Sequence, residues 1–212
     1  LVVHMYWINE VDNGNLFCDG IYPFGMHALI YYMHAVFDIP TVRIVLWMGP
    51  VQTFYIFIML LCFLKTVCRF RYTPYLCFFA FVVGDYVQHG RFSRYYATLP
   101  QEYGMIFLLP CAMGLIWFFH EMKKERMEYR KLKKEKLLYT AVPKRYRIKD
   151  SAIYLWLLII SFGLTLSVHF YDTIIAVFLV LAGLIAFADY LLHWKTLRKI
   201  IVAGLLAFLI PI

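Results

Sequence analysis

Apolar runs close to the length of a membrane span recur along this chain of 212 residues, and they constrain its fold more than any motif does. A helix needs about 20 consecutive apolar residues to cross the ~30 Å hydrocarbon layer of a bilayer. Because 63% of the residues are hydrophobic, an ordinary water-soluble domain is a poor explanation. The sequence predicts an all-α, polytopic bundle of about five to six transmembrane helices, with spans at residues 44–64, 74–83, 103–119, 152–168, 173–192 and from 200 onward.

Basic stretches separate the predicted spans and set their orientation. Residues 120–150 contain twelve Lys and Arg against five acidic residues, and further cations flank the turns near residues 65–71 and 195–199. Because positively charged loops stay in the cytoplasm, all three basic turns are predicted to lie on the cytoplasmic side of the plasma membrane. Their charge suits an anionic membrane surface, and no nucleic-acid partner is expected.

The chain is expected to have two parts. Residues 1–42 form an outer loop, and residues 43–212 form the transmembrane bundle, which includes the basic cytoplasmic loop 120–150. The chain starts at Leu1 and stops inside an apolar run at Ile212, which indicates a fragment truncated at both ends.

Two short helices are predicted in the outer loop. The first is stopped by Asn13-Gly14, a strong turn signal, and the second covers residues 25–37. On the second helix a polar face and an apolar face repeat at helical spacing, which is typical of a segment lying in the membrane interface. The polar face carries His27, Tyr31, His34 and Asp38. Two histidines seven residues apart do not have the spacing of neighbouring metal ligands on one helix, which favours hydrogen-bonded histidines over a zinc site.

The alternation of spans places most of the reactive side chains on the outer side, opposite the basic turns. Solvation of loops alone would enrich polar residues there. The outer loop nevertheless contains a denser pattern, in which "HMYWINE" is followed by "DGIYPFGMHAL" and then by a span. This pattern resembles the first outer loop of bacterial polytopic glycosyltransferases of the GT-C type. His4 matches the first interfacial helix of that family, and the turn that opens the second is matched by Tyr22, Pro23, Gly25, His27 and Ala28.

The resemblance implies a function and a set of site residues. GT-C enzymes transfer a sugar from a polyprenyl-phosphate-linked donor to an acceptor on the non-cytoplasmic face. An aspartate of the first outer loop is implied as the catalytic base, a place that Asp19 and Asp12 suit. Some members bind a divalent cation, Mg²⁺ or Mn²⁺, for which Asp19 and Asp85 are the implied ligands. The leading aspartate of the family precedes the first helix, so its counterpart is expected before Leu1.

The chemistry of sugar transfer marks further candidates on the outer side. A positively charged, sugar-like transition state needs a carboxylate, and an anionic leaving group needs positive charge. The candidates for substrate binding are His4, His27, His34, Arg91, Arg94, Glu102, His169 and Asp172. Interfacial anchoring would also explain the two arginines, and capping of neighbouring helices would explain His169 and Asp172.

Two other functions remain open on the sequence alone. A lipid-carrier flippase or transporter would need polar groups near the bilayer midplane or broken helices, and the spans at 152–168 and 173–192 hold few such groups. A non-catalytic membrane scaffold would be favoured by outer carboxylates that point apart. The expected partners of the enzyme are the lipid-linked donor and membrane lipids.

Overall fold

The computed structural model of the chain describes residues 2–15, 24–89, 97–134 and 150–211, and these residues fold into helices without any strand. The helices are α1 (Val2–Asp12), α2 (Gly25–Phe37), α3 (Thr41–Val67), α4 (Thr73–His89), α6 (Pro100–Lys134), α7 (Asp150–Val168), α8 (Phe170–Ala186), α9 (Ala188–Leu191) and α10 (Trp194–Phe208). The predicted all-α class is therefore confirmed.

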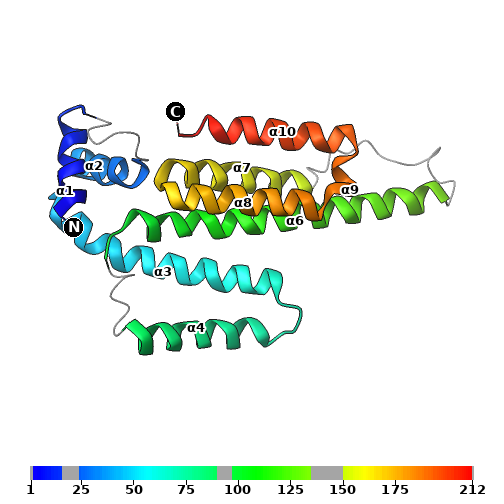
Figure 1. Cartoon of the computed structure of the whole chain (residues 1–212), viewed down its shortest axis with the longest axis horizontal. Helices are drawn as coiled ribbons and strands as arrows, with labels where there is room; N and C mark the ends of the chain where they lie inside the picture. The colour runs from blue at the N-terminus through cyan, green and yellow to red at the C-terminus, as the bar shows by residue number, and fades with distance from the viewer. Residues whose placement is uncertain (1, 16–23, 90–96, 135–149, 212) are drawn as a thin grey trace.

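The long helices lie roughly parallel and alternate in direction, with α6 in the middle of the bundle (Figure 1). Helix α6 packs against α7, α8 and α3, while α4 lies outside α3. Phe119 of α6 stacks on Phe187 beside α8, with ring centroids 4.5 Å apart. Gly114 allows the closest approach of α6 to α7, because a Cβ atom there would lie 2.9 Å from the backbone nitrogen of Leu158.

Within the described ranges, three helices are long and apolar enough to cross a membrane: residues Thr41–Val67 in α3, Pro100–Met127 in α6 and Ser151–Val168 in α7. They contain the spans predicted at 44–64, 103–119 and 152–168. The runs at 74–83 and 173–192 fall in shorter apolar helices, and the second of these is divided between α8 and α9. Length and composition thus support a membrane protein with three spans, and the larger number stays a prediction.

The two N-terminal helices begin and end close to where the sequence predicts. Helix α1 stops before Gly14, whose φ of +81° few residues other than glycine adopt readily. Helix α2 covers the predicted range and ends at Asp38, which is left-handed with φ +52°. Their apolar faces pack on the start of α3, in a core that includes Ile8, Met26, Ile30, Ile44, Val45 and Met48.

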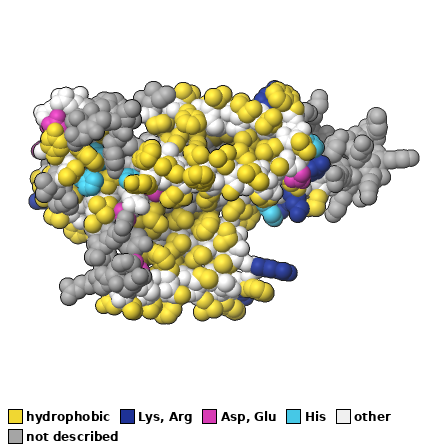
Figure 2. All heavy atoms as spheres, viewed as in Figure 1, with side chains coloured by type: hydrophobic (Ala, Val, Ile, Leu, Met, Phe, Trp, Pro, Cys, Tyr) yellow, Lys and Arg dark blue, Asp and Glu magenta, His cyan; other side chains and the backbone are white. Residues whose placement is uncertain are grey.

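The bundle has two chemically different ends. At one of them α3 turns into α4, α6 finishes, and α7 and α10 begin (Figure 1). Most of the Lys and Arg side chains visible in the space-filling view gather there (Figure 2), and we call it the basic end. Helices α1 and α2, the start of α6 and the α7–α8 turn lie at the opposite end. The predicted grouping of the basic turns is thus confirmed for the turns after α3 and before α10, whereas residues 135–149 lie outside the described residues.

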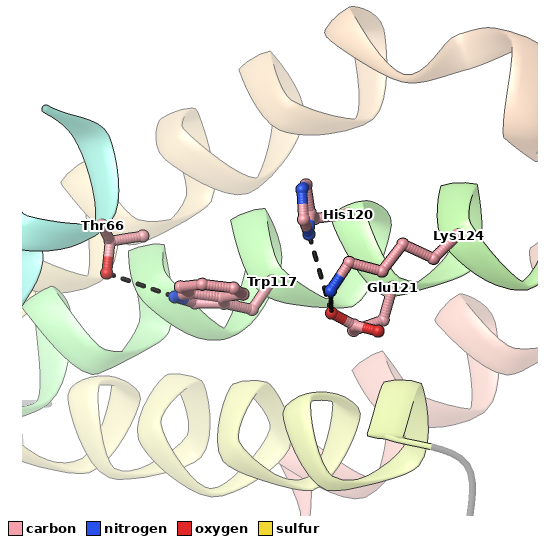
Figure 3. A network of polar contacts seen from close by, with 5 residues as sticks. All are labelled: Thr66, Trp117, His120, Glu121 and Lys124. Atoms are coloured by element: carbon pink, nitrogen blue, oxygen red, sulfur yellow. Dashed lines mark hydrogen bonds and ion pairs between the residues drawn. The ribbon is translucent and has the colours of Figure 1, made fainter. Parts of the chain in front are cut away.

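A polar network fastens the helices together at the basic end (Figure 3). The indole nitrogen of Trp117 donates to the Thr66 hydroxyl at 3.2 Å, which joins α6 to α3. One turn further along α6, the Lys124 ammonium lies 2.5 Å from a carboxylate oxygen of Glu121, which His120 also approaches. The Trp117–Thr66 bond joins two helices, whereas the contacts of Glu121 stay within α6, where His120 and Lys124 are half exposed.

Candidate functional site

Two histidines from different helices meet at the end opposite the basic end. Nδ1 of His4 on α1 lies 3.1 Å from Nε2 of His27 on α2, and the ring of Trp7 meets both imidazoles edge to face. Burial lowers the pKa of His27 to about 4, with His4 adding to the effect, and burial also lowers the pKa of His4. Both rings are therefore neutral at pH 7, so one ring nitrogen donates the hydrogen bond and the other accepts it.

Three more ionisable side chains lie next to this pair. Nδ1 of His169 lies 3.4 Å from Oδ2 of Asp172, in the first turn of α8. Glu102, from the first turn of α6, is close enough to act electrostatically on both of them, and His169 in turn acts on His4. Glu102 and Asp172 are only 2% and 1% exposed, so solvation of loops does not explain their position. We call His4, His27, Glu102, His169 and Asp172 the polar cluster.

Asp172 is the member of the polar cluster with the most altered acidity. It lies outside the three helices that are long enough to span a membrane. Burial, reinforced by the neighbouring charge of Glu102, raises the pKa of its carboxyl to about 7. Burial also lowers the pKa of His169, although Glu102 opposes that change. A carboxyl that exchanges its proton near neutral pH is suited to general acid–base chemistry.

Two glycines make room for the polar cluster. A Cβ atom at position 104 would lie 2.2 Å from Oδ2 of Asp172, so a larger residue there would displace the carboxylate or move α6 away from α8. A Cβ atom at position 25 would lie 2.7 Å from the carbonyl oxygen of Ser167, so Gly25 allows the start of α2 to sit against the end of α7. Side-chain capping does not hold His169 in place, since His169 precedes α8 without a capping hydrogen bond.

An apolar groove of about 560 Å³ lies between α2, α3 and α6, two of which also contribute to the polar cluster, although no cluster residue lines the groove. Helix α6 contributes to both, because Tyr103 lines the groove while Gly104 touches Asp172. Helix α2 does the same, with His27 in the cluster and Met33 in the groove. Besides Tyr103 and Met33, the lining consists of Leu29, Ile39, Arg43, Ile44, Trp47, Met48, Val51, Gln52, Tyr55, Ile106 and Phe107.

The remaining predicted residues are not brought into the polar cluster. The ring nitrogen Nδ1 of His34 lies 2.8 Å from the carbonyl oxygen of Ile39, so His34 stabilises the end of α2. Asp12 is exposed at the end of α1, eight residues and therefore about 12 Å along the helix from His4. Asp85 is half-buried on α4. Asp19, Arg91 and Arg94 lie outside the described residues.

The predicted divalent-cation site is not formed by the part of the chain that the structure describes. Among those residues, no group of three or more His, Cys, Asp or Glu side chains could hold a metal ion. Of the two predicted ligands, Asp19 and Asp85, only Asp85 belongs to the described residues. The cation stays a prediction, and the chemistry below is built on the chain's own side chains.

Two polar contacts that support the site were missed by sequence reasoning. The amide nitrogen of Gln52 donates to the carbonyl oxygen of Ala97 at 2.6 Å, and the Thr98 hydroxyl donates to the carbonyl oxygen of Val45. Both contacts fix the segment before α6, and with it Glu102, against α3. The sequence contains a signal for the first contact, because Gln52 is a polar residue inside an otherwise apolar run.

Comparison of the chain with protein-family models, with curated proteins and with solved structures finds no match.

Proposed function

We propose that this chain is a membrane glycosyltransferase of the GT-C type, which moves a sugar from a polyprenyl-phosphate-linked donor to an acceptor on the non-cytoplasmic face. The observation that carries the proposal is the meeting of four buried ionisable side chains and the half-buried His4, drawn from four regions of the chain. Such burial of charge-bearing groups is costly, and sites of chemistry are where it is commonly found.

Asp172 is the proposed catalytic base. The acceptor hydroxyl attacks the anomeric carbon of the donor sugar and gives its proton to the Asp172 carboxylate. The bond between that carbon and the phosphate oxygen breaks, and the phosphate leaves with the electron pair. Burial and, to a smaller extent, the charge of Glu102 raise the pKa of Asp172 to about 7, so the carboxylate is basic enough to take the proton at physiological pH. Asp12 and Asp19, which the resemblance implies for this role, are the competing candidates.

The groove is the proposed place for the polyprenyl chain. Its apolar walls suit a hydrocarbon tail. The side chain of Trp47, which lines the groove and is 68% exposed, adds to the apolar surface that a tail could contact. Arg43 lines the same groove and supplies positive charge for the phosphate. Helices α2 and α6 contribute residues to both the groove and the polar cluster, so the proposal places the tail of the carrier in the groove and directs its sugar phosphate toward the cluster. The proposed membrane arrangement keeps residues 74–83, 173–192 and the run from 200 onward as further spans, which leaves Asp172 at the outer end of its helix.

Two observations weigh against the other functions. The buried hydroxyls of α7 are bonded within the helix, since Ser161 donates to the Leu157 carbonyl oxygen at 2.5 Å and Thr165 to that of Ser161 at 2.8 Å. These hydroxyls therefore do not line a transport path. A scaffold would leave the outer carboxylates apart, whereas Glu102 and Asp172 lie close together.

The proposal is tested with full-length protein in liposomes and undecaprenyl-phosphate hexoses labelled in the sugar. We expect Asp172→Asn to lower the rate at which label leaves the lipid carrier by about 10²- to 10⁴-fold, the usual contribution of a general base. The wild-type rate should rise as the pH passes through about 7, because the base must be deprotonated.

Asp38→Asn is the matched control, since Asp38 is exposed and asparagine tolerates its left-handed backbone. It should leave the rate within about twofold of the wild type, well below the change expected for a lost base. Full activity in Asp172→Asn would remove Asp172 from the mechanism. A wild-type protein that releases no label from any of the hexose donors would contradict the glycosyltransferase proposal itself.

A further inference from the structure

A second groove lies at the basic end of the bundle, away from the polar cluster. It has a volume of about 300 Å³ and runs between α7 and α10. Helix α7 contributes Trp156 and Ile159, and helix α10 contributes Arg198, Val202 and Leu206, among others. We infer that this groove binds one anionic phospholipid, with an acyl chain between the helices and the phosphate on Arg198 and Lys199. This inference does not depend on the proposed function.

The groove is charged at one end and apolar along its length. Arg198, Val202 and Leu206 are spaced four residues apart, so they form one row along the surface of α10. The row covers eight residues and therefore about 12 Å of helix. One leaflet of a bilayer offers about 15 Å of hydrocarbon, half of the ~30 Å layer. The groove therefore matches an acyl chain in length, and its cations lie where the headgroup of that chain would be.

The α7 wall has the same polarity. Helices α7 and α10 both start at the basic end and run in the same direction (Figure 1). Trp156 lies in the second turn of α7, as Arg198 does in α10, and its side chain is 56% exposed. Tryptophan at the level of the headgroups is typical of a membrane interface. Ile159, one turn deeper, is only 5% exposed and belongs to the apolar part of the wall.

The two cations lack an intramolecular counter-charge within the described residues. Neither Arg198 nor Lys199 has an ion pair or a hydrogen bond there, and the first turn of α10 has no acidic residue. Lys124, by contrast, is paired with Glu121 at the same end of the bundle. A phosphodiester would supply the missing negative charge and accept hydrogen bonds from both side chains.

The apolar walls favour a lipid over a water-soluble anion. A free phosphate could pair with Arg198 and Lys199, but it would leave the surface of Val202 and Leu206 uncovered. A phospholipid covers both parts of the groove at once. The headgroup and the acyl chain should therefore each contribute to binding, and each can be removed by a separate substitution.

Native mass spectrometry of the detergent-purified full chain tests this inference. The protein is offered an equimolar mixture of dioleoyl phosphatidylglycerol and dioleoyl phosphatidylcholine, which share their acyl chains and differ in net charge. Wild-type protein should retain phosphatidylglycerol preferentially. The double variant Arg198→Gln/Lys199→Gln should lower that preference by about 30-fold, as expected for two cations beside anionic lipid. Val202→Phe, which fills the groove, should lower the retention of both lipids.

The matched control removes the same charge elsewhere at the basic end. Arg69→Gln/Arg71→Gln alters two exposed cations in the turn between α3 and α4 and should keep the preference for phosphatidylglycerol. Equal preference in the wild type and in Arg198→Gln/Lys199→Gln would overturn the inference, as would an equal loss in the control. Displacement of the lipid by inorganic phosphate at the same concentration, or unchanged retention in Val202→Phe, would also overturn it.

Discussion

At the scale of single residues, burial decides which protonation state each group of the polar cluster keeps. His4 and His27 share one hydrogen bond as neutral rings, while Asp172 takes up its proton near neutral pH. The same desolvation favours the uncharged form in both cases, and it therefore lowers the pKa of histidines and raises that of the carboxyl. The cluster thus contains hydrogen-bonding groups that stay neutral and one group that can change its charge.

The histidine pair predicts acid-sensitive folding. Folded His27 resists protonation down to about pH 4, whereas the unfolded side chain gains its proton near pH 6.5. Unfolding therefore takes up a proton between these values, so the free energy of unfolding falls as the pH drops from 6.5 to 4. Asp172, whose folded-state pKa is raised to about 7, stabilises the fold in the opposite direction over this range. We therefore expect the thermal midpoint of the wild type to fall relative to that of His27→Gln as the pH drops from 6.5 to 4.

His193→Gln is the control for this measurement, because His193 is exposed at the basic end. It should keep the wild-type dependence on pH. If His27→Gln loses stability between pH 6.5 and 4 as steeply as the wild type does, His27 is not the group that takes up the proton.

Sequence reasoning at the residue scale found candidates but not their distances from one another. The sidedness of the spans placed His4, His27, Glu102, His169 and Asp172 at one surface, and the structure brings these five together. The same reasoning selected Asp12 and His34, which lie apart from the cluster. The predicted side of the membrane fixes only the end of the bundle at which a residue lies. Whether two residues at that end are close together depends on which helices pack against each other.

At the scale of helices, apolar periodicity and turn signals located most elements. The range 25–37 matches α2, and Asn13-Gly14 ends α1 as predicted. The run at 173–192 was predicted as one helix, whereas the structure divides it at Phe187 between α8 and α9. Phe187 stacks on Phe119, a tertiary contact that no local pattern reveals. Interfacial placement of α1 and α2 stays a prediction, while their packing on α3 is observed.

The contact of α6 with α8 depends on Gly104. A methyl group there would collide with Asp172, so Gly104→Ala should force the two helices or the carboxylate to move. Overpacking of this kind costs about 1–3 kcal/mol, and we expect a lower thermal midpoint together with lower transfer activity.

Gly84→Ala is the matched control in α4, where the added methyl group meets no atom within 4 Å. It should leave the midpoint unchanged or raise it, since alanine is favoured over glycine in a helix by about 0.5–1 kcal/mol. Equal midpoints for Gly104→Ala and the wild type would show that α6 and α8 are not held at this distance.

At the scale of the whole molecule, the separation of the two ends predicts how the protein lies in a membrane. The turn between α3 and α4 belongs to the basic end and should face the cytoplasm, whereas Asn13 lies at the opposite end and should face outward. In a variant without native cysteines, Asn13→Cys should react with a membrane-impermeant maleimide in intact cells. Arg71→Cys should react only after the cells are permeabilised. Labelling of both positions from the same side would contradict the arrangement.

The polar cluster draws on residues from position 4 to position 172, and this spread has a consequence for biosynthesis. At roughly 5–20 residues per second, the ribosome adds Asp172 on the order of ten seconds or more after His4. Throughout that interval the imidazoles of α1 and α2 exist without the carboxyl that completes their surroundings. A nascent chain that stalls before α8 therefore carries an incomplete polar cluster, and any chemistry that needs Asp172 has to await the emergence of α8.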